Sequence, residues 1–171
     1  MRALLERLSN PLHLAIALLV VWLTFSSPWI GMYQRMPDQP GWINLSHVLG
    51  GFAVLAMTLV YGLACTHGGR WRLYFSWLAG DFAATGRDIA GMFRGELPMS
   101  EGGGLFAAIE GLLLLAVLLA AVTGAAWFLV QGSATAPTWR EAHIVAARSA
   151  AALTILHFVC VSLHLLDFVR E

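Results

Sequence analysis

Four long apolar segments constrain this chain more than any other feature. They cover about residues 11–31, 43–66, 105–130 and 141–168, and each is long enough to cross about 30 Å of membrane hydrocarbon as a helix. The 171 residues are 58% hydrophobic and 12% charged, more apolar than a water-soluble domain of this size can bury. The sequence therefore predicts an all-α fold: an integral membrane four-helix bundle that forms a single membrane domain over residues 1–171.

The polar connection between spans two and three, residues 67–104, mixes basic and aromatic residues. This mixture predicts an interfacial amphipathic helix over about residues 73–94. Arginines favour the cytoplasmic side of a membrane, and most of them fall on one side here, namely Arg2, Arg7, Arg70, Arg72, Arg87, Arg94 and Arg170. Only Arg35 and Arg140 fall on the other side. We therefore expect a bacterial inner membrane protein whose termini and long connection are cytoplasmic. The net charge of zero gives no indication of nucleic-acid binding.

The last span carries a stripe of histidines. His143 and His157 are fourteen residues apart, which places them about 40° apart around a helix and about 21 Å apart along it. His164 follows seven residues later and continues the same stripe. Ionisable side chains inside a membrane are costly, so three on one face indicate ligands or a proton path.

The expected orientation assigns each histidine a depth. His47 begins span two and His143 begins span four from the same side, so they lie at one level. His13 begins span one from the other side, and residue counting leaves either His157 or His164 as its partner. Two facing imidazoles at each of two levels suit bis-histidine ligation of two b-type haems. A zinc or copper site would gather its ligands at one depth, and no CxxCH motif is present for covalent haem attachment.

Three sequence elements carry a resemblance to a known family. They are PLH at 11–13, NLSHVLGG at 44–51, and EAH at 141–143 with its fourteen-residue spacing to the next histidine. They resemble the four-helix di-haem cytochrome b membrane proteins. That family includes the bacterial cytochrome b561 type and the cytochrome b subunits of formate dehydrogenase, nickel-iron hydrogenase and thiosulfate reductase. The resemblance implies that the outer haem iron is bound by His47 and His143, and the inner haem iron by His13 and His157.

Two further side chains are candidates for binding. Arg148 lies five residues into the membrane from His143, where its charge needs a partner. A haem propionate and a carboxylate of a partner subunit are both suitable. His164 is a candidate hydrogen-bond partner of quinone, a proton carrier or an interfacial histidine.

Two glycines and two carboxylates leave alternatives open. Gly50 and Gly51 follow His47 by one helical turn, and either make room for a flat ligand or allow a neighbouring helix to approach. Glu110 and Asp167, near the cytoplasmic surface, either relay protons to a quinone or are ordinary interfacial carboxylates.

Together these features predict a di-haem b-type cytochrome that carries electrons across the membrane between an outer-face donor and the quinone pool. Its cofactors would be two haem b groups and its substrate quinone. We expect the electron-transfer membrane subunit of a larger respiratory oxidoreductase, with an iron-sulfur or c-type cytochrome partner subunit. By resemblance, the alternative is a stand-alone superoxide:quinone oxidoreductase of the b561 type. A haem-free membrane anchor or a haem-binding sensor are alternatives of another class, and a homodimer stays open.

Overall fold

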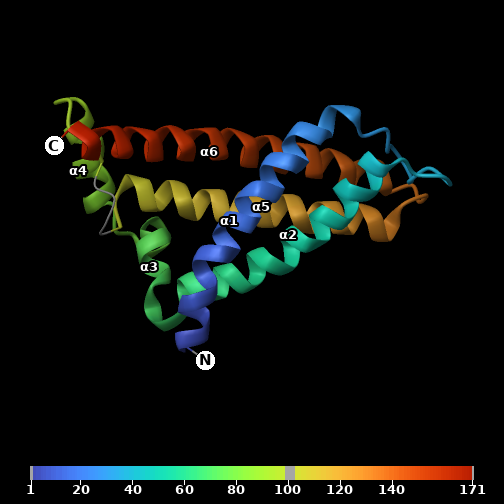
Figure 1. Cartoon of the computed structure of the whole chain (residues 1–171). Coiled ribbons are helices and arrows are strands. Elements are labelled where there is room, and N and C mark those ends of the chain that lie inside the picture. The colour runs from blue at the N-terminus through green and yellow to red at the C-terminus, as the bar shows by residue number, and fades with distance from the viewer. Residues whose placement is uncertain (1, 99–102, 171) are drawn as a thin grey trace. The chain divides into compact units, whose positions relative to one another are not determined.

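Four long helices dominate the computed structural model, which describes residues 2–98 and 103–170 and gives only the backbone for 2–9, 68, 164 and 166–170. These helices are α1 (Arg2–Ser26), α2 (Trp42–Thr66), α5 (Leu105–Val130) and α6 (Ala136–Arg170) (Figure 1). Four segments are long and apolar enough to cross a membrane. Three lie within α2, α5 and α6, namely Trp42–Thr66, Leu105–Val130 and Ala136–Leu163, and the fourth, Asn10–Trp29, extends three residues beyond the end of α1. The described residues form no strand. The predicted all-α fold with four candidate spans is confirmed.

The helix ends follow local sequence signals. α2 and α5 match the predicted spans to within a residue, because polar and glycine-rich connections bound their apolar runs. α6 begins five residues earlier than predicted, at Ala136. Pro137 occupies its first turn, where a proline costs no hydrogen bond. α1 ends at Ser26 and continues as the short 3-10 helix η1 (Ser27–Trp29), which contains Pro28.

Large apolar side chains on the spans are exposed, as contact with lipid requires. On α1, the exposed fractions of Leu14, Leu18 and Phe25 are 63%, 63% and 70%. At 100° per residue these three positions fall on one face of the helix. On α6, Val145 and Ile155 are similarly exposed. A water-soluble fold would bury such stripes, so the surface agrees with a membrane protein.

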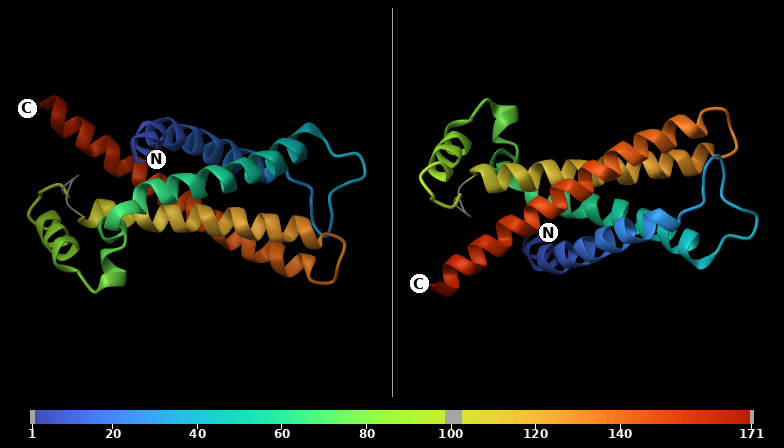
Figure 2. Two further views of the ribbon diagram at one scale, coloured as in Figure 1. Left: turned by 90° about the horizontal axis from the view of Figure 1, so that it is seen from below. Right: turned by 90° about the horizontal axis from the view of Figure 1, so that it is seen from above.

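The chain divides into two compact units, and each is described here by itself. The first unit contains Met1–Ala64 and Ala116–Ala151, and the second contains Cys65–Leu115 and Ala152–Glu171. In the first unit, the turn at 131–135 joins the end of α5 to the start of α6, and the adjoining parts of these helices run side by side in both views of Figure 2. The single membrane domain expected from the sequence stays a prediction.

The first unit has a small core at the end that carries the connections 30–41 and 131–135. Met32, Trp127 and Ala136 form this core, and neighbouring apolar side chains pack against it. The Trp127 indole Nε1 donates a hydrogen bond to the Tyr33 carbonyl at 3.1 Å. The backbone amide of Gly132 donates to the Gln34 carbonyl at 2.7 Å, so the two connections are tied together.

The second unit differs from the expectation of one amphipathic helix over residues 73–94. The structure forms three short helices in this region, namely α3 (Trp71–Tyr74), the 3-10 helix η3 (Ser76–Ala79) and α4 (Ala83–Met92). Phe75 leaves the helical conformation after α3, with φ −123° and ψ 42°. Gly80 ends η3 with φ 73°, a left-handed conformation that glycine adopts without strain. An interfacial location for these helices stays a prediction.

Close backbone contacts hold these short helices against the start of α5. A Cβ added at Gly111 would collide with the backbone oxygen of Tyr74, so this glycine allows α3 to approach. The Asp88 carboxylate accepts a hydrogen bond from the Leu105 amide at 2.7 Å and thereby caps α5. Burial raises the pKa of the Tyr74 phenol, and negative charge at Cys65 and Glu110 raises it further.

Candidate cofactor site

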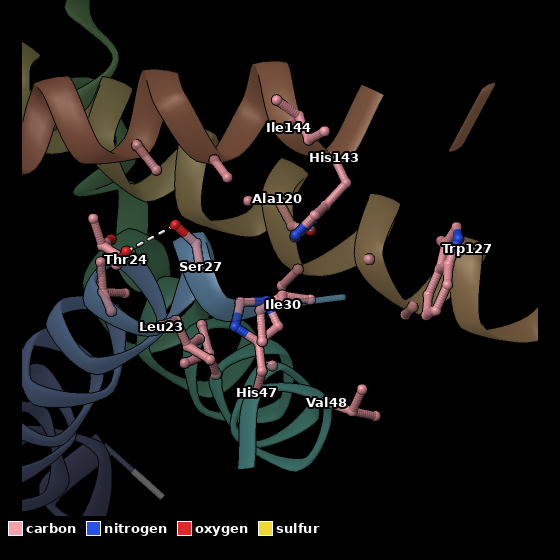
Figure 3. A pocket seen from close by; sticks show the side chains of 18 of the residues that line it. Leu23, Thr24, Ser27, Ile30, His47, Val48, Ala120, Trp127, His143 and Ile144 are labelled. Atoms are coloured by element: carbon pink, nitrogen blue, oxygen red, sulfur yellow. Dashed lines mark hydrogen bonds between the residues drawn. The ribbon is translucent and has the colours of Figure 1, made fainter. Parts of the chain in front are cut away.

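Two of the predicted ligand histidines meet in the first unit. His47 projects from α2 and His143 from α6, and their rings point toward one another (Figure 3). The ring centres are 6.2 Å apart and the ring planes are perpendicular. When two imidazoles bind one metal from opposite sides, their ring centres lie about 6 Å apart, because each metal–nitrogen bond takes about 2 Å and each ring adds about 1 Å. The pair therefore has the separation that a shared metal ion requires.

Span three fixes the orientation of the His143 ring. Nδ1 of His143 lies 2.8 Å from the carbonyl oxygen of Ala120 on α5. A carbonyl can only accept a hydrogen bond, so Nδ1 carries the proton and Nε2 keeps its lone pair. Metal-binding histidines are oriented in this way by a partner on the other ring nitrogen. The hydrogen bond leaves Nε2 as the ring nitrogen whose lone pair could bind a metal ion.

A side chain at the end of α1 fixes the orientation of the His47 ring. The Ser26 side chain is 4% exposed, and its hydroxyl oxygen lies 3.3 Å from His47 Nδ1. The hydroxyl donates its one proton to the Leu23 carbonyl at 3.2 Å. The serine oxygen therefore accepts the proton of His47 Nδ1, and Nε2 of His47 is left with its lone pair. Both histidines thus present Nε2 as a neutral ligand.

A cavity of about 530 Å³ adjoins the two rings. This volume falls within the range of about 300–1,000 Å³ that small-molecule and cofactor sites occupy. Its walls come from α1, η1, α2, α5 and α6 of the first unit and are mostly apolar. The lining includes the residues labelled in Figure 3, such as Leu23, Val48, Trp127 and Ile144. An apolar site of this size with two fixed imidazoles is suited to a large, flat, largely apolar metal complex.

The structure separates the roles of three glycines near the rings. A Cβ at Gly50 would lie 3.3 Å from the Leu23 side chain, so this glycine allows α2 to pack on α1. Gly51 lines the cavity, and a Cβ there would meet nothing within 4 Å. A Cβ at Gly124 would lie 3.1 Å from Cε1 and Nδ1 of His143. Helix packing, one of the two alternatives for these glycines, therefore applies to Gly50, while a role of Gly51 in making room for a ligand stays a prediction.

The remaining predicted ligands lie elsewhere. His13 is exposed on α1 in the first unit, and its ring stacks on Tyr61 with the ring centres 5.6 Å apart. His157 belongs to the second unit and stacks on Phe106 at 5.5 Å. The pairing of His13 with His157 stays a prediction. The side chain of His164 lies outside the described part of the structure, as does that of Asp167.

Arg148 lines the same cavity as the two histidines, although its side chain is exposed. Arg140 also lines the cavity, and sequence reasoning assigned it only a topological role. Ser26 and the carbonyl of Ala120 were missed as well. Ser26 precedes a second serine and a proline at the end of a span, which resembles a simple helix terminus. A backbone carbonyl leaves no signal in the sequence, but the small residues Ala120 and Gly124, four apart on α5, are typical of close helix packing.

The pair supplies two nitrogen ligands and no more. Among the side chains that the structure describes, no group of three or more His, Cys, Asp or Glu residues could hold a metal ion. A structural zinc site needs four such ligands, so a metal ion at His47 and His143 would have to bring its other donor atoms with it. Comparisons of the chain with protein-family models, with curated proteins and with solved structures find no match.

Proposed function

We propose that the chain is a b-type cytochrome in which His47 and His143 bind one haem iron from opposite sides. The separation of 6.2 Å between their ring centres is the observation that supports this most directly. A porphyrin supplies four nitrogens in its plane, which accounts for a site with only two protein ligands. The apolar cavity beside the rings suits the macrocycle, and Gly51 leaves room for it.

A haem held in this way supplies one-electron transfer, and the protein's part is to hold and insulate it. Ala120 and Ser26 keep both imidazoles in the tautomer that presents Nε2. Neutral imidazoles place no fixed charge in the apolar site. With His47 and His143 both holding the haem, the site would favour electron transfer over binding of a further ligand to the metal.

The complete function that we propose is electron transport across a membrane between a donor on the outer face and the quinone pool. Four helices long and apolar enough to cross a membrane support the membrane location. The second haem, with His13 and His157 as ligands, rests on the histidine pattern and on the family resemblance, as does a quinone site near His164. An iron-sulfur or c-type cytochrome subunit is the partner that we expect to supply the electrons.

The test is a pyridine-haemochrome count of b haem per chain in purified protein. We expect two haems in the wild type and one in each of His47→Ala and His143→Ala. The double variant should also keep one, because the two histidines share a haem. His67→Ala is a matched control, since His67 is exposed in the 3-10 helix η2 (His67–Gly69) and should lose none. A wild type without haem, or a double variant that loses two, would contradict the proposal.

Electron transfer to quinone needs a second measurement on the same preparations. A soluble quinol should reduce the haem of the wild type, and the reduced bands should appear within the same time course at both haems. If the protein binds haem but quinol does not reduce it, the haem site stands and the quinone role is wrong. A haem-binding sensor would then be the better description.

A further inference from the structure

Arg140 is held in one orientation by the connection that precedes α2. Its Nε donates a hydrogen bond to the Met32 carbonyl at 3.0 Å. Its guanidinium carbon lies 5.1 Å from the centre of the Tyr33 ring, at cation-π distance. The Tyr33 backbone is fixed in turn by the indole of Trp127. The guanidinium is therefore immobilised before any ligand binds, which reduces the entropy cost of binding one.

Arg140 is also part of the lining of the cavity beside the two histidines. Arg140 precedes His143 by three residues on α6, and both line the cavity. With Nε bound to Met32, the terminal nitrogens keep four N–H donors in a planar fork. No carboxylate in the described part of the chain pairs with Arg140. A half-buried cation without a counter-ion beside a cofactor cavity indicates an anionic ligand.

The position of Arg140 along α6 favours it over Arg148. α6 begins at Ala136, so Arg140 lies near the helix end at which the two connections meet, and Arg148 lies two turns deeper. A haem carries two propionate carboxylates on one edge of the ring. Charged carboxylates avoid the hydrocarbon interior, so this edge should face the helix end. Of the two arginines that line the cavity, Arg140 is the one at that end.

We propose that Arg140 binds a propionate carboxylate of the haem held by His47 and His143. This inference rests on the proposed function and adds a third contact to it. Planar guanidinium and carboxylate groups pair through two parallel hydrogen bonds, which fixes the rotation of the haem about the axis between the two histidines. The contact would also connect the haem to the 30–33 segment through Met32 and Tyr33.

The test combines a change in the protein with a change in the ligand. Apo-protein is titrated with haem and with haem dimethyl ester, in which both carboxylates are esterified. Binding is followed by Soret absorption in the wild type and Arg140→Gln. We expect Arg140→Gln to bind haem about tenfold more weakly than the wild type does, since a charge-assisted hydrogen bond contributes about one order of magnitude in affinity. The variant and the wild type should bind the ester with the same affinity. Arg35→Gln is the control, because Arg35 does not line the cavity.

Three outcomes would overturn the inference. The first is that the wild type binds the ester as tightly as haem, and the second is that Arg140→Gln weakens the binding of haem and of ester by the same factor. The third is that the loss of affinity for haem alone appears in Arg148→Gln and not in Arg140→Gln. If Arg140→Gln fails to fold, the comparison of haem with its ester in the wild type still decides whether carboxylates contribute. Failure of the wild type to bind either ligand would instead refute the proposed function.

Discussion

Gly124→Ala is expected to weaken haem binding at His47 and His143 while leaving the fold at least as stable. The added methyl carbon would lie 3.1 Å from Cε1 and Nδ1 of His143, about 0.3 Å less than the shortest ordinary contact of 3.4 Å. The imidazole must therefore shift by a few tenths of an ångström. The hydrogen bond from Nδ1 to the Ala120 carbonyl, now 2.8 Å long, would be strained or lost.

Two magnitudes with opposite effects make this prediction specific. Replacing a glycine inside a helix by alanine stabilises the helix by about 0.5–1 kcal/mol. Disturbing the partner that orients a metal-binding histidine typically lowers metal affinity by about 10- to 100-fold. We therefore expect an unfolding temperature equal to or above that of the wild type, together with an outer-site haem affinity at least tenfold lower.

The assay measures both quantities on the same protein. Haem titration of the apo-protein followed by Soret absorption gives the affinity, and circular dichroism during heating gives the unfolding temperature. Gly86→Ala on α4 is the matched control, because a Cβ there meets nothing within 4 Å and should leave haem affinity unchanged. If Gly124→Ala binds haem as tightly as the wild type, α5 does not hold the His143 ring and the account of the site is wrong.

Three further predictions concern the cavity and the second unit. Gly51→Leu should fill space in the cavity and abolish haem binding at His47 and His143, while the helix content stays that of the wild type. If the variant binds as much haem as the wild type, the haem does not occupy this cavity. Asp88→Ala removes the hydrogen bond that caps α5 at Leu105, so a denaturant titration should show a free energy of unfolding that is lower by about 1 kcal/mol. Asp81→Ala is the control and should cause a smaller loss, because Asp81 is more exposed. Tyr74 has a raised pKa in the folded state, so its neutral form favours folding below the ordinary pKa of 10.0, and that contribution is lost as pH rises through the folded value. Tyrosinate absorption should show a late-titrating tyrosine that is missing in Tyr74→Phe, and titration curves that do not differ at high pH would contradict this.

The spans could be predicted from the sequence because their signal is local and long. Apolar runs bounded by polar and glycine-rich connections located α2 and α5 almost to the residue. The positions of His47 and His143 at the starts of spans two and four also placed them at one depth, and the structure brings these two rings together. Both results follow from where the apolar runs begin and end, which a sequence encodes directly.

The rest depends on contacts between segments that are distant in the sequence. Ser26 reaches His47, twenty-one residues away, and Arg140 reaches Met32 across 108 residues. No periodicity reports such contacts. The break in the predicted helix over 73–94 has a local cause at Gly80, but aromatic and basic patterning outweighed that single glycine in the sequence reasoning.

The most direct test of the central claim is electron paramagnetic resonance of the oxidised protein in a His157→Ala background, in which we expect only the haem at His47 and His143 to remain. Two imidazoles on one ferric haem make it low-spin, and perpendicular ring planes give a strongly anisotropic signal. The rings of His47 and His143 are perpendicular, so we predict this signal, and we predict its loss when either histidine is replaced by alanine. A high-spin signal in the His157→Ala protein, or a low-spin signal that survives both further substitutions, would contradict a haem shared by His47 and His143.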